Sequence, residues 1–183
     1  MQMLEAAGLE TFTDKERTAD DSNPKGYYEH EAVKNLQHNN KWLPEAKGKV
    51  VKIIAQLLSH LPANYHYQVI FMERDVLEVI ASQQKMLVRD GKRVNEDTLQ
   101  LQLVNQYTQT VDKVKEWAEN QPNVDIIFLS HQEVVKNPFL KAMLVNDFLS
   151  GQLPVEKMAS AVDKNLYREK KEKFNHSGTF AKG

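Results

Sequence analysis

The sequence predicts an α/β fold with a mainly parallel sheet that helices cover on both faces. Three apolar runs have the length and β-branched content of buried strands, at 48–54, 67–72 and 124–129. Two segments between the last two runs, 75–89 and 95–120, carry apolar residues at helical spacing. Because strands that alternate with helices of this length need crossover connections, neighbouring strands are expected to be parallel.

The segment before the first long strand is expected to hold shorter elements. Met1–Ala7 resembles the last turns of a helix that ends at Gly8, and no capping residue precedes it, so the chain is expected to begin inside an element. Leu9–Thr13 could form a short strand, and turn chemistry indicates a loop over 14–26. A helix is expected over Glu29–Gln37.

Three helices are expected after the last strand, at 132–136, 138–149 and 155–166. The end of the chain is charged and then rich in Gly, Ser and Lys. We therefore expect one α/β domain over 1–168 and a charged, disordered tail over 169–183.

Composition and charge exclude several classes of protein. With 24 Lys and Arg against 25 Asp and Glu, the net charge of −1 gives no basis for general nucleic-acid or anionic-membrane binding. The absence of cysteine excludes disulfides and sulfur-ligated zinc, and favours a reducing, cytoplasmic setting. No apolar run approaches the roughly 20 residues of a membrane span. Because the opening segment carries Glu5 and lacks a basic start, we do not expect it to be a secretory signal.

The junction after the second strand carries the most specific local signal. Arg74 follows an apolar strand, and Asp75 with Glu78 resembles a helix capping box. Ligands of open α/β sheets bind at this end of the strands, where a guanidinium can hold a phosphate through two hydrogen bonds. Ser82 could add a hydroxyl from the same side. On spacing alone a plainer interpretation is favoured, in which Arg74 pairs with Glu73 or Asp75 and Ser82 only packs.

A resemblance to a known family changes this balance. The segment 69–82 resembles the part of P-loop sulfotransferases in which a strand runs into an arginine, an Asp-containing turn and a helix with a serine eight positions after the arginine. Other segments resemble bacterial members in the same order, at 20–29 (DDSNPKGYYE), 128–138 (FLSHQEVVKNP) and 151–168 (GQLPVEKMASAVDKNLYR). The resemblance covers nearly all of 1–168.

The resemblance implies a three-layer domain of the P-loop nucleotide-binding type. It implies transfer of a sulfuryl group from 3′-phosphoadenosine 5′-phosphosulfate to a hydroxyl or amine, with Arg74 and Ser82 holding the 3′-phosphate of this donor. The acceptor and the oligomeric state are left unassigned. Two alternatives stay open: a non-catalytic remnant or nucleotide-binding module, and a nucleotide kinase-like phosphotransferase, since one fold hosts many functions.

One departure from the family concerns its phosphosulfate-binding loop, a Gly/Ser/Thr-rich turn whose backbone N–H groups cradle the 5′-phosphosulfate. No glycine-rich run occurs here, and Met1–Gly8 resembles the end of the helix that should follow it. We expect either an N-terminally truncated chain or a protein without this loop. With the first central strand missing, we expect unpaired backbone groups or a rearranged sheet, and low stability.

The resemblance suggests catalytic residues but leaves the base open. Lys52 lies near the family's strand lysine and could stabilise charge on the bridging oxygen, although a solvated lysine is equally well supported. Ile54 stands where cytosolic members have a catalytic histidine. Glu29, His30 and Glu31 follow the loop that borders the acceptor site and are candidate bases, although a solvated helix N-terminus is the plainer interpretation. His30 and Glu31 match the start of the zinc-protease motif H-E-x-x-H, but Lys34 stands where the motif has its second histidine. No metal site is therefore expected.

Overall fold

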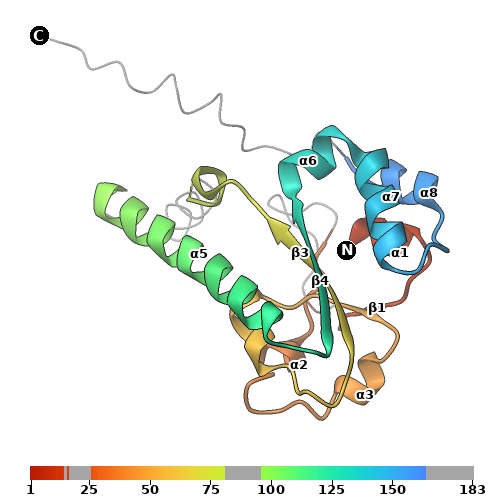
Figure 1. Ribbon diagram of the computed structural model, residues 1–183, viewed down its shortest axis with the longest axis horizontal. Coiled ribbons are helices and arrows are strands. Elements are labelled where there is room, and N and C mark those ends of the chain that lie inside the picture. The colour runs from red at the N-terminus through yellow and green to blue at the C-terminus, as the bar shows by residue number, and fades with distance from the viewer. Residues whose placement is uncertain (15, 17–25, 81–95, 164–183) are drawn as a thin grey trace, which may run out of the picture.

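The computed structural model describes residues 1–14, 16, 26–80 and 96–163, without the side chains of 96–100 (Figure 1). Its helices are α1 (Gln2–Ala6), α2 (Glu31–Lys34), α3 (Leu43–Ala46), the 3₁₀ helix η1 (Ala55–His60), α5 (Glu96–Glu119), α6 (His131–Lys136), α7 (Pro138–Phe148) and α8 (Val155–Ser160). Its strands are β1 (Thr11–Phe12), β2 (Val50–Val51), β3 (Tyr67–Glu73) and β4 (Val124–Ser130). A further helix begins at residue 76 and is described as far as residue 80. The tail predicted at 169–183 lies outside these residues.

β3 and β4 form the longest sheet of the described chain. They pair in parallel and in continuous register, from Tyr67 opposite Val124 to Glu73 opposite Ser130. The long helix α5 lies between them in the chain, so it forms part of the crossover connection that parallel neighbours require. This pair confirms the strands predicted at 67–72 and 124–129 and their parallel direction.

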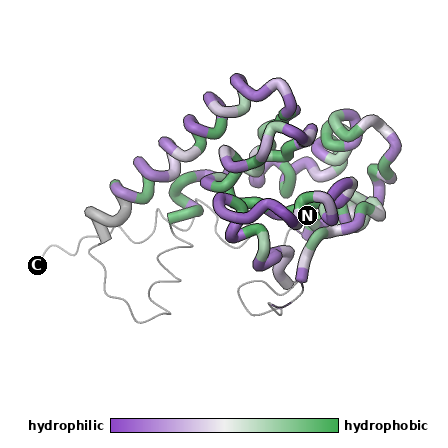
Figure 2. The backbone as a smooth tube through the Cα atoms, turned by 90° about the horizontal axis from the view of Figure 1, so that it is seen from below, coloured by the Kyte–Doolittle hydropathy of each residue, from purple (hydrophilic) through white to green (hydrophobic). Residues whose placement is uncertain are grey.

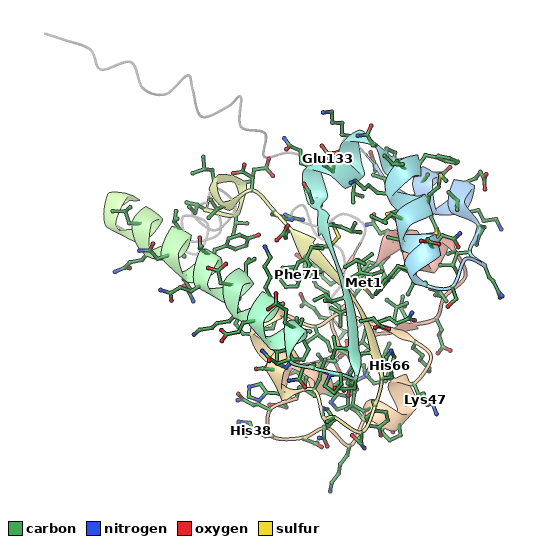
Figure 3. All side chains as sticks on the ribbon, viewed as in Figure 1. Met1, His38, Lys47, His66, Phe71 and Glu133 are labelled. Carbon is green, nitrogen blue, oxygen red and sulfur yellow. The ribbon has the colours of Figure 1, made fainter. Side chains whose placement is uncertain are left out.

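Helices pack on both faces of the β3–β4 pair. On one face the rings of Phe71 and Phe128 lie 5.3 Å apart, and the Lys115 ammonium of α5 lies 5.3 Å from the centre of the Phe128 ring. Figure 3 shows Phe71 on the side of the sheet that is turned toward α5. The face of Ile127 and Leu129 packs instead against α1, α6, α7 and α8. The described part of the chain is therefore a roughly α/β arrangement with three layers at this pair.

The second sheet is smaller than the sequence predicts. β1 pairs with β2 in parallel, with Thr11 opposite Val50 and Phe12 opposite Val51. The run 48–54 was expected to be a full buried strand, but only two of its residues pair, because β1 offers only two partners and the chain then enters η1. The described residues thus contain two small parallel sheets in place of one continuous sheet.

Two hydrophobic clusters lie beside the two sheets, and Val50 of β2 also packs against the cluster beside β4. The cluster next to the β1–β2 pair is formed by α2, α3 and η1 and contains Phe12, Val33, Leu36, Trp42, Leu43, Ala46 and Leu57. The cluster beside β4 contains Leu4, Leu129, Val134, Ala142, Val145 and Met158. Figure 3 places Glu133 at the α6 end of β4 and Lys47 near α3 at the opposite end of the molecule.

Helix boundaries agree best with the prediction where apolar periodicity is long. α5 runs over Glu96–Glu119 against a predicted 95–120, and Figure 2 shows hydrophilic and hydrophobic segments alternating along it. α1 ends as expected at Gly8, which adopts a φ of +90°. α2 is only four residues long against a predicted Glu29–Gln37. Among the described residues, none of the helices combines the length and apolar character that crossing a bilayer requires.

Candidate functional site

The carboxyl ends of β3 and β4 lie side by side at one edge of the parallel pair. Glu73 and Ser130 are opposite one another as the last residues of the two strands, so Arg74 and His131 follow at the same level. Ligands of open α/β sheets bind at this edge, because the strands end and the following helices begin there. Arg74 therefore stands at the end of the sheet that the strand pattern predicts for it.

Both helices that leave this edge have side-chain caps. Oδ1 of Asp75 accepts a hydrogen bond from the N–H of Leu77 at 3.0 Å, at the start of the helix that begins at residue 76. Oγ of Ser130 accepts one from the N–H of Glu133 at 3.3 Å and caps α6. Short oxygen-bearing side chains are favoured as caps because they satisfy otherwise unpaired N–H groups. The caps fix where the chain turns at Arg74 and at His131.

Tyr107 of α5 holds the backbone of Arg74. Its hydroxyl accepts a hydrogen bond from the Arg74 N–H at 2.9 Å and donates one to the Arg74 carbonyl oxygen, also at 2.9 Å. The sequence marks Tyr107 only as a member of an apolar helix face, and no local signal indicates a contact across 33 residues. The end of β3 is therefore fixed to α5 at the residue that carries the guanidinium.

His131 lies next to Arg74 and is partly buried. Burial, and then the positive charge of Arg74, lower the pKa of His131 from 6.5 to about 4. The imidazole is therefore neutral near pH 7. The guanidinium of Arg74 therefore has a neutral ring beside it.

The lowered pKa of His131 predicts a pH dependence of stability. Its folded pKa lies below its unfolded value of 6.5, so the unfolded chain binds more protons between about pH 4 and pH 6.5. The contribution of neutral His131 to the stability of the folded chain is therefore complete above pH 6.5 and is lost as the pH falls from 6.5 toward 4. Urea unfolding at about pH 5 and pH 7 is expected to show a smaller difference in stability for His131→Gln than for the original chain. The exposed His38 offers a matched control, and equal pH dependence of His131→Gln and His38→Gln would contradict the prediction.

A second group of polar side chains includes Lys52, which directly follows β2. Its Nζ donates a hydrogen bond to Oε1 of Glu29 at 3.0 Å, and the two side chains are 38% and 34% exposed. The structure thus brings together two of the candidate catalytic residues, one cation and one carboxylate. Because more than a third of each side chain is exposed to water, the ion pair is expected to contribute at most about 1 kcal/mol to stability.

Met1 lies near Lys52, and α1 is linked to the residue that precedes Glu29. The Tyr28 hydroxyl donates to Oε2 of Glu5 at 2.5 Å, and burial together with Glu5 raises the pKa of Tyr28 to about 12. Burial and then the Lys52 ammonium lower the pKa of the Met1 amino group. The residue before Glu29 is therefore tied to α1, and Glu29 itself is tied to the end of β2.

His30 is engaged in the local fold. Its Nδ1 accepts a hydrogen bond from the Ala32 N–H at 3.1 Å and caps α2. Its ring stacks on Phe12 with centroids 4.2 Å apart and planes 7° apart, and Phe12 lies 5.3 Å from Trp42. One ring nitrogen of His30 is thus used for the cap, and its ring is held by an aromatic stack.

Glu31 lies on the surface of α2. Its carboxylate pairs with Lys34 at 2.6 Å, and both side chains are about 60% exposed. Its N–H donates to Oδ2 of Asp14 at 2.6 Å, and this hydrogen bond is the main cause that lowers the pKa of Asp14. Glu31 is also well placed to complement the dipole at the start of the helix.

Ser82, the expected partner of Arg74, lies outside the described residues. Within the part of the chain that the structure describes, no three His, Cys, Asp or Glu side chains are grouped so that they could hold a metal ion. Two hollows of about 470 and 570 Å³ lie between α1 and α8 and along α7. Neither is lined by Arg74 or Lys52, so both lie apart from the two polar groups.

Comparison with protein-family models, with curated proteins and with solved structures found no match to this chain.

Proposed function

We propose that this chain is a sulfotransferase-like protein that binds 3′-phosphoadenosine 5′-phosphosulfate and transfers its sulfuryl group to a hydroxyl or amine. The observation that carries the proposal is the location of Arg74 at the carboxyl end of β3, directly before a capped helix and beside the start of α6. In this role Arg74 holds the 3′-phosphate of the nucleotide, and Ser82 adds a hydroxyl.

The surroundings of Arg74 suit a phosphate ligand. A guanidinium offers two parallel N–H donors that match two phosphate oxygens. The imidazole of His131 beside Arg74 is neutral near pH 7, so it does not compete with a phosphate for the guanidinium as a carboxylate would. Because the Tyr107 hydroxyl binds both backbone polar groups of Arg74, less ordering of this residue is needed when a ligand binds.

The transfer step assigns roles to Lys52 and Glu29. As the bond from sulfur to the donor's phosphate oxygen breaks, a bond from sulfur to the acceptor oxygen or nitrogen forms, and the acceptor loses a proton. We assign the stabilisation of the leaving oxygen to the Lys52 ammonium and the removal of the proton to the Glu29 carboxylate. His30 and Glu31 are weaker candidates for the base, since one caps a helix and the other pairs with Lys34 at the surface.

A nucleotide-binding module without transfer activity is the second candidate function. It is favoured by one feature of the sequence, which has seven glycines and no glycine-rich run that could cradle a 5′-phosphosulfate. Arg74 would bind the 3′-phosphate in both cases. Binding and transfer therefore have to be measured separately.

Calorimetric titration of the full chain with two nucleotides tests the binding step. Adenosine 3′,5′-bisphosphate is expected to bind at least about tenfold more tightly than ATP, because only the former carries the 3′-phosphate that Arg74 recognises. Adenosine 5′-monophosphate, which lacks that phosphate, is the matched control. Equal affinity for ATP would favour the kinase-like alternative, and no binding of the bisphosphate would contradict the proposal.

Lys52→Met tests the transfer step. We expect release of adenosine 3′,5′-bisphosphate from the donor, in the presence of a panel of phenols and amines, to be at least about 100-fold slower in this variant. The affinity for the bisphosphate should change by less than about threefold, because Arg74 is untouched. Lys136→Met, a change at an exposed lysine of α6, is the control. Equal rates in both variants would remove Lys52 from the mechanism, and no release by the original chain would favour the binding module.

A further inference from the structure

Helix α7 is apolar on both of its faces. On the inner face Ala142 is fully buried and Val145 is 3% exposed, within the cluster beside β4. On the outer face large apolar side chains are between 44% and 60% exposed, and these are Phe139, Leu140, Met143 and Leu144. They are four of the seven exposed large apolar side chains in the described part of the chain. An ordinary surface helix is mostly polar on its outer side, whereas this one exposes four large apolar side chains, so we expect the outer face to be covered.

The outer face also borders a shallow depression that is open to solvent. A depression of about 570 Å³ follows α7 and is lined by Leu140, Met143, Leu144 and the first residue of α8, Val155. Figure 1 shows α7 and α8 at the outside of the molecule, away from α5. Exposed apolar patches next to a concave surface mark sites of association more often than ordinary protein surface does.

Two opposite charges are arranged symmetrically about the middle of this face. Lys141 and Asp147 line the same hollow and lie three residues before and three residues after Leu144. Neither side chain has an ion-pair partner among the residues that the structure describes. If two α7 helices pack antiparallel about a twofold axis at Leu144, each Lys141 lies at the level of Asp147 of the other copy. This self-complementarity favours a second copy of the chain as the partner.

We propose that the outer face of α7, defined by Phe139, Leu140, Lys141, Met143, Leu144 and Asp147, is the interface of a homodimer with antiparallel α7 helices. A membrane surface is a poorer partner, because helices that bind anionic lipids carry an excess of Lys and Arg, whereas here one lysine is balanced by one aspartate. One helix face covers less than the roughly 800 Å² per partner of a standard stable interface. The dimer is therefore expected to form in the micromolar range.

Sedimentation equilibrium of the full chain, from about 1 to about 200 µM, tests the proposal. The average mass is expected to rise from 21.1 kDa toward twice that value over this range. Leu144→Glu is expected to keep the chain monomeric, because it places two carboxylates at the twofold axis. Since Leu144 is an exposed side chain, the circular dichroism spectrum and the melting temperature of the Leu144→Glu variant should match those of the original chain.

Charge-reversal variants distinguish a symmetric dimer from the binding of a different partner to this face. Lys141→Asp and Asp147→Lys are each expected to weaken dimerisation by at least about tenfold, because each places like charges opposite one another. The double variant is expected to restore it, since the exchanged charges again face opposite signs. Lys113→Asp, at an exposed site on α5, makes the same charge change and should leave the mass unaffected. A chain that stays monomeric throughout, or a dimer that none of these changes on α7 weakens, would overturn the proposal.

Discussion

Replacing Arg74 with alanine is expected to weaken the binding of adenosine 3′,5′-bisphosphate by at least about 30-fold. A hydrogen bond to a charged group contributes about 1.5–3 kcal/mol, and the guanidinium can make two such bonds to a phosphate. A loss of about 2 kcal/mol corresponds to about 30-fold in affinity. The variant should remain folded, since the Tyr107 hydroxyl contacts only the backbone of Arg74. Calorimetric titration measures the change.

Two further variants show whether the effect comes from charge or from geometry. Arg74→Lys keeps the charge and loses the paired donors, so it should recover only part of the affinity. Lys113→Ala removes one positive charge from an exposed site on α5 and should leave the affinity within about twofold of the original value. If Arg74→Ala and Lys113→Ala bind the bisphosphate equally well, the phosphate is not held by Arg74.

Replacing Trp42 with alanine is expected to lower the free energy of unfolding by about 3–5 kcal/mol. The indole is 7% exposed, stacks 5.3 Å from the Phe12 ring and donates to the Asn39 carbonyl oxygen at 3.2 Å. The truncation leaves a cavity in the cluster beside the β1–β2 pair. It also removes one of the two aromatic rings that stack on Phe12, the other being the His30 ring. Urea unfolding followed by circular dichroism measures the loss.

Trp42→Phe should cost less than the alanine variant, because it keeps a ring in the stack and loses the hydrogen bond. Leu101→Ala is the control, since this leucine of α5 is 66% exposed and its replacement should change stability by no more than about 0.5 kcal/mol. Equal stability of Trp42→Ala and Leu101→Ala would contradict the described packing of the β1–β2 cluster.

The elements that the sequence predicts well are those with strong local patterns. β3, β4 and α5 match their predicted ranges closely, because a buried strand and a long amphipathic helix each repeat their apolar spacing over several residues. β2 is shorter than its apolar run indicates. The length of a strand depends on its partner, and the two residues of β1 are set by contacts distant in the chain.

The sequence predicts where Arg74 lies in the fold but does not predict its tertiary contacts. The strand pattern places Arg74 at the end of β3 and Asp75 at the start of a helix, and both features are present. The Tyr107 contact to Arg74 depends on the packing of α5, and the sequence does not encode this as a motif. The lowered pKa of His131 results from burial beside Arg74, which depends on tertiary packing and not on a local motif.

The three candidate bases also differ in their tertiary contacts, which the sequence does not show. The adjacent positions of Glu29, His30 and Glu31 make them equivalent in the sequence. The fold separates them, since Glu29 meets Lys52, His30 stacks on Phe12 and Glu31 faces water beside Lys34. Such differences come from the tertiary neighbours of each side chain, so spacing alone does not reveal them.

A crystal structure of the full chain with adenosine 3′,5′-bisphosphate would test the central proposal most directly. We predict that oxygens of the 3′-phosphate lie within about 3 Å of the Arg74 guanidinium nitrogens and that the Ser82 hydroxyl contacts the same phosphate. A nucleotide bound elsewhere, with Arg74 and Ser82 on different surfaces, would contradict it.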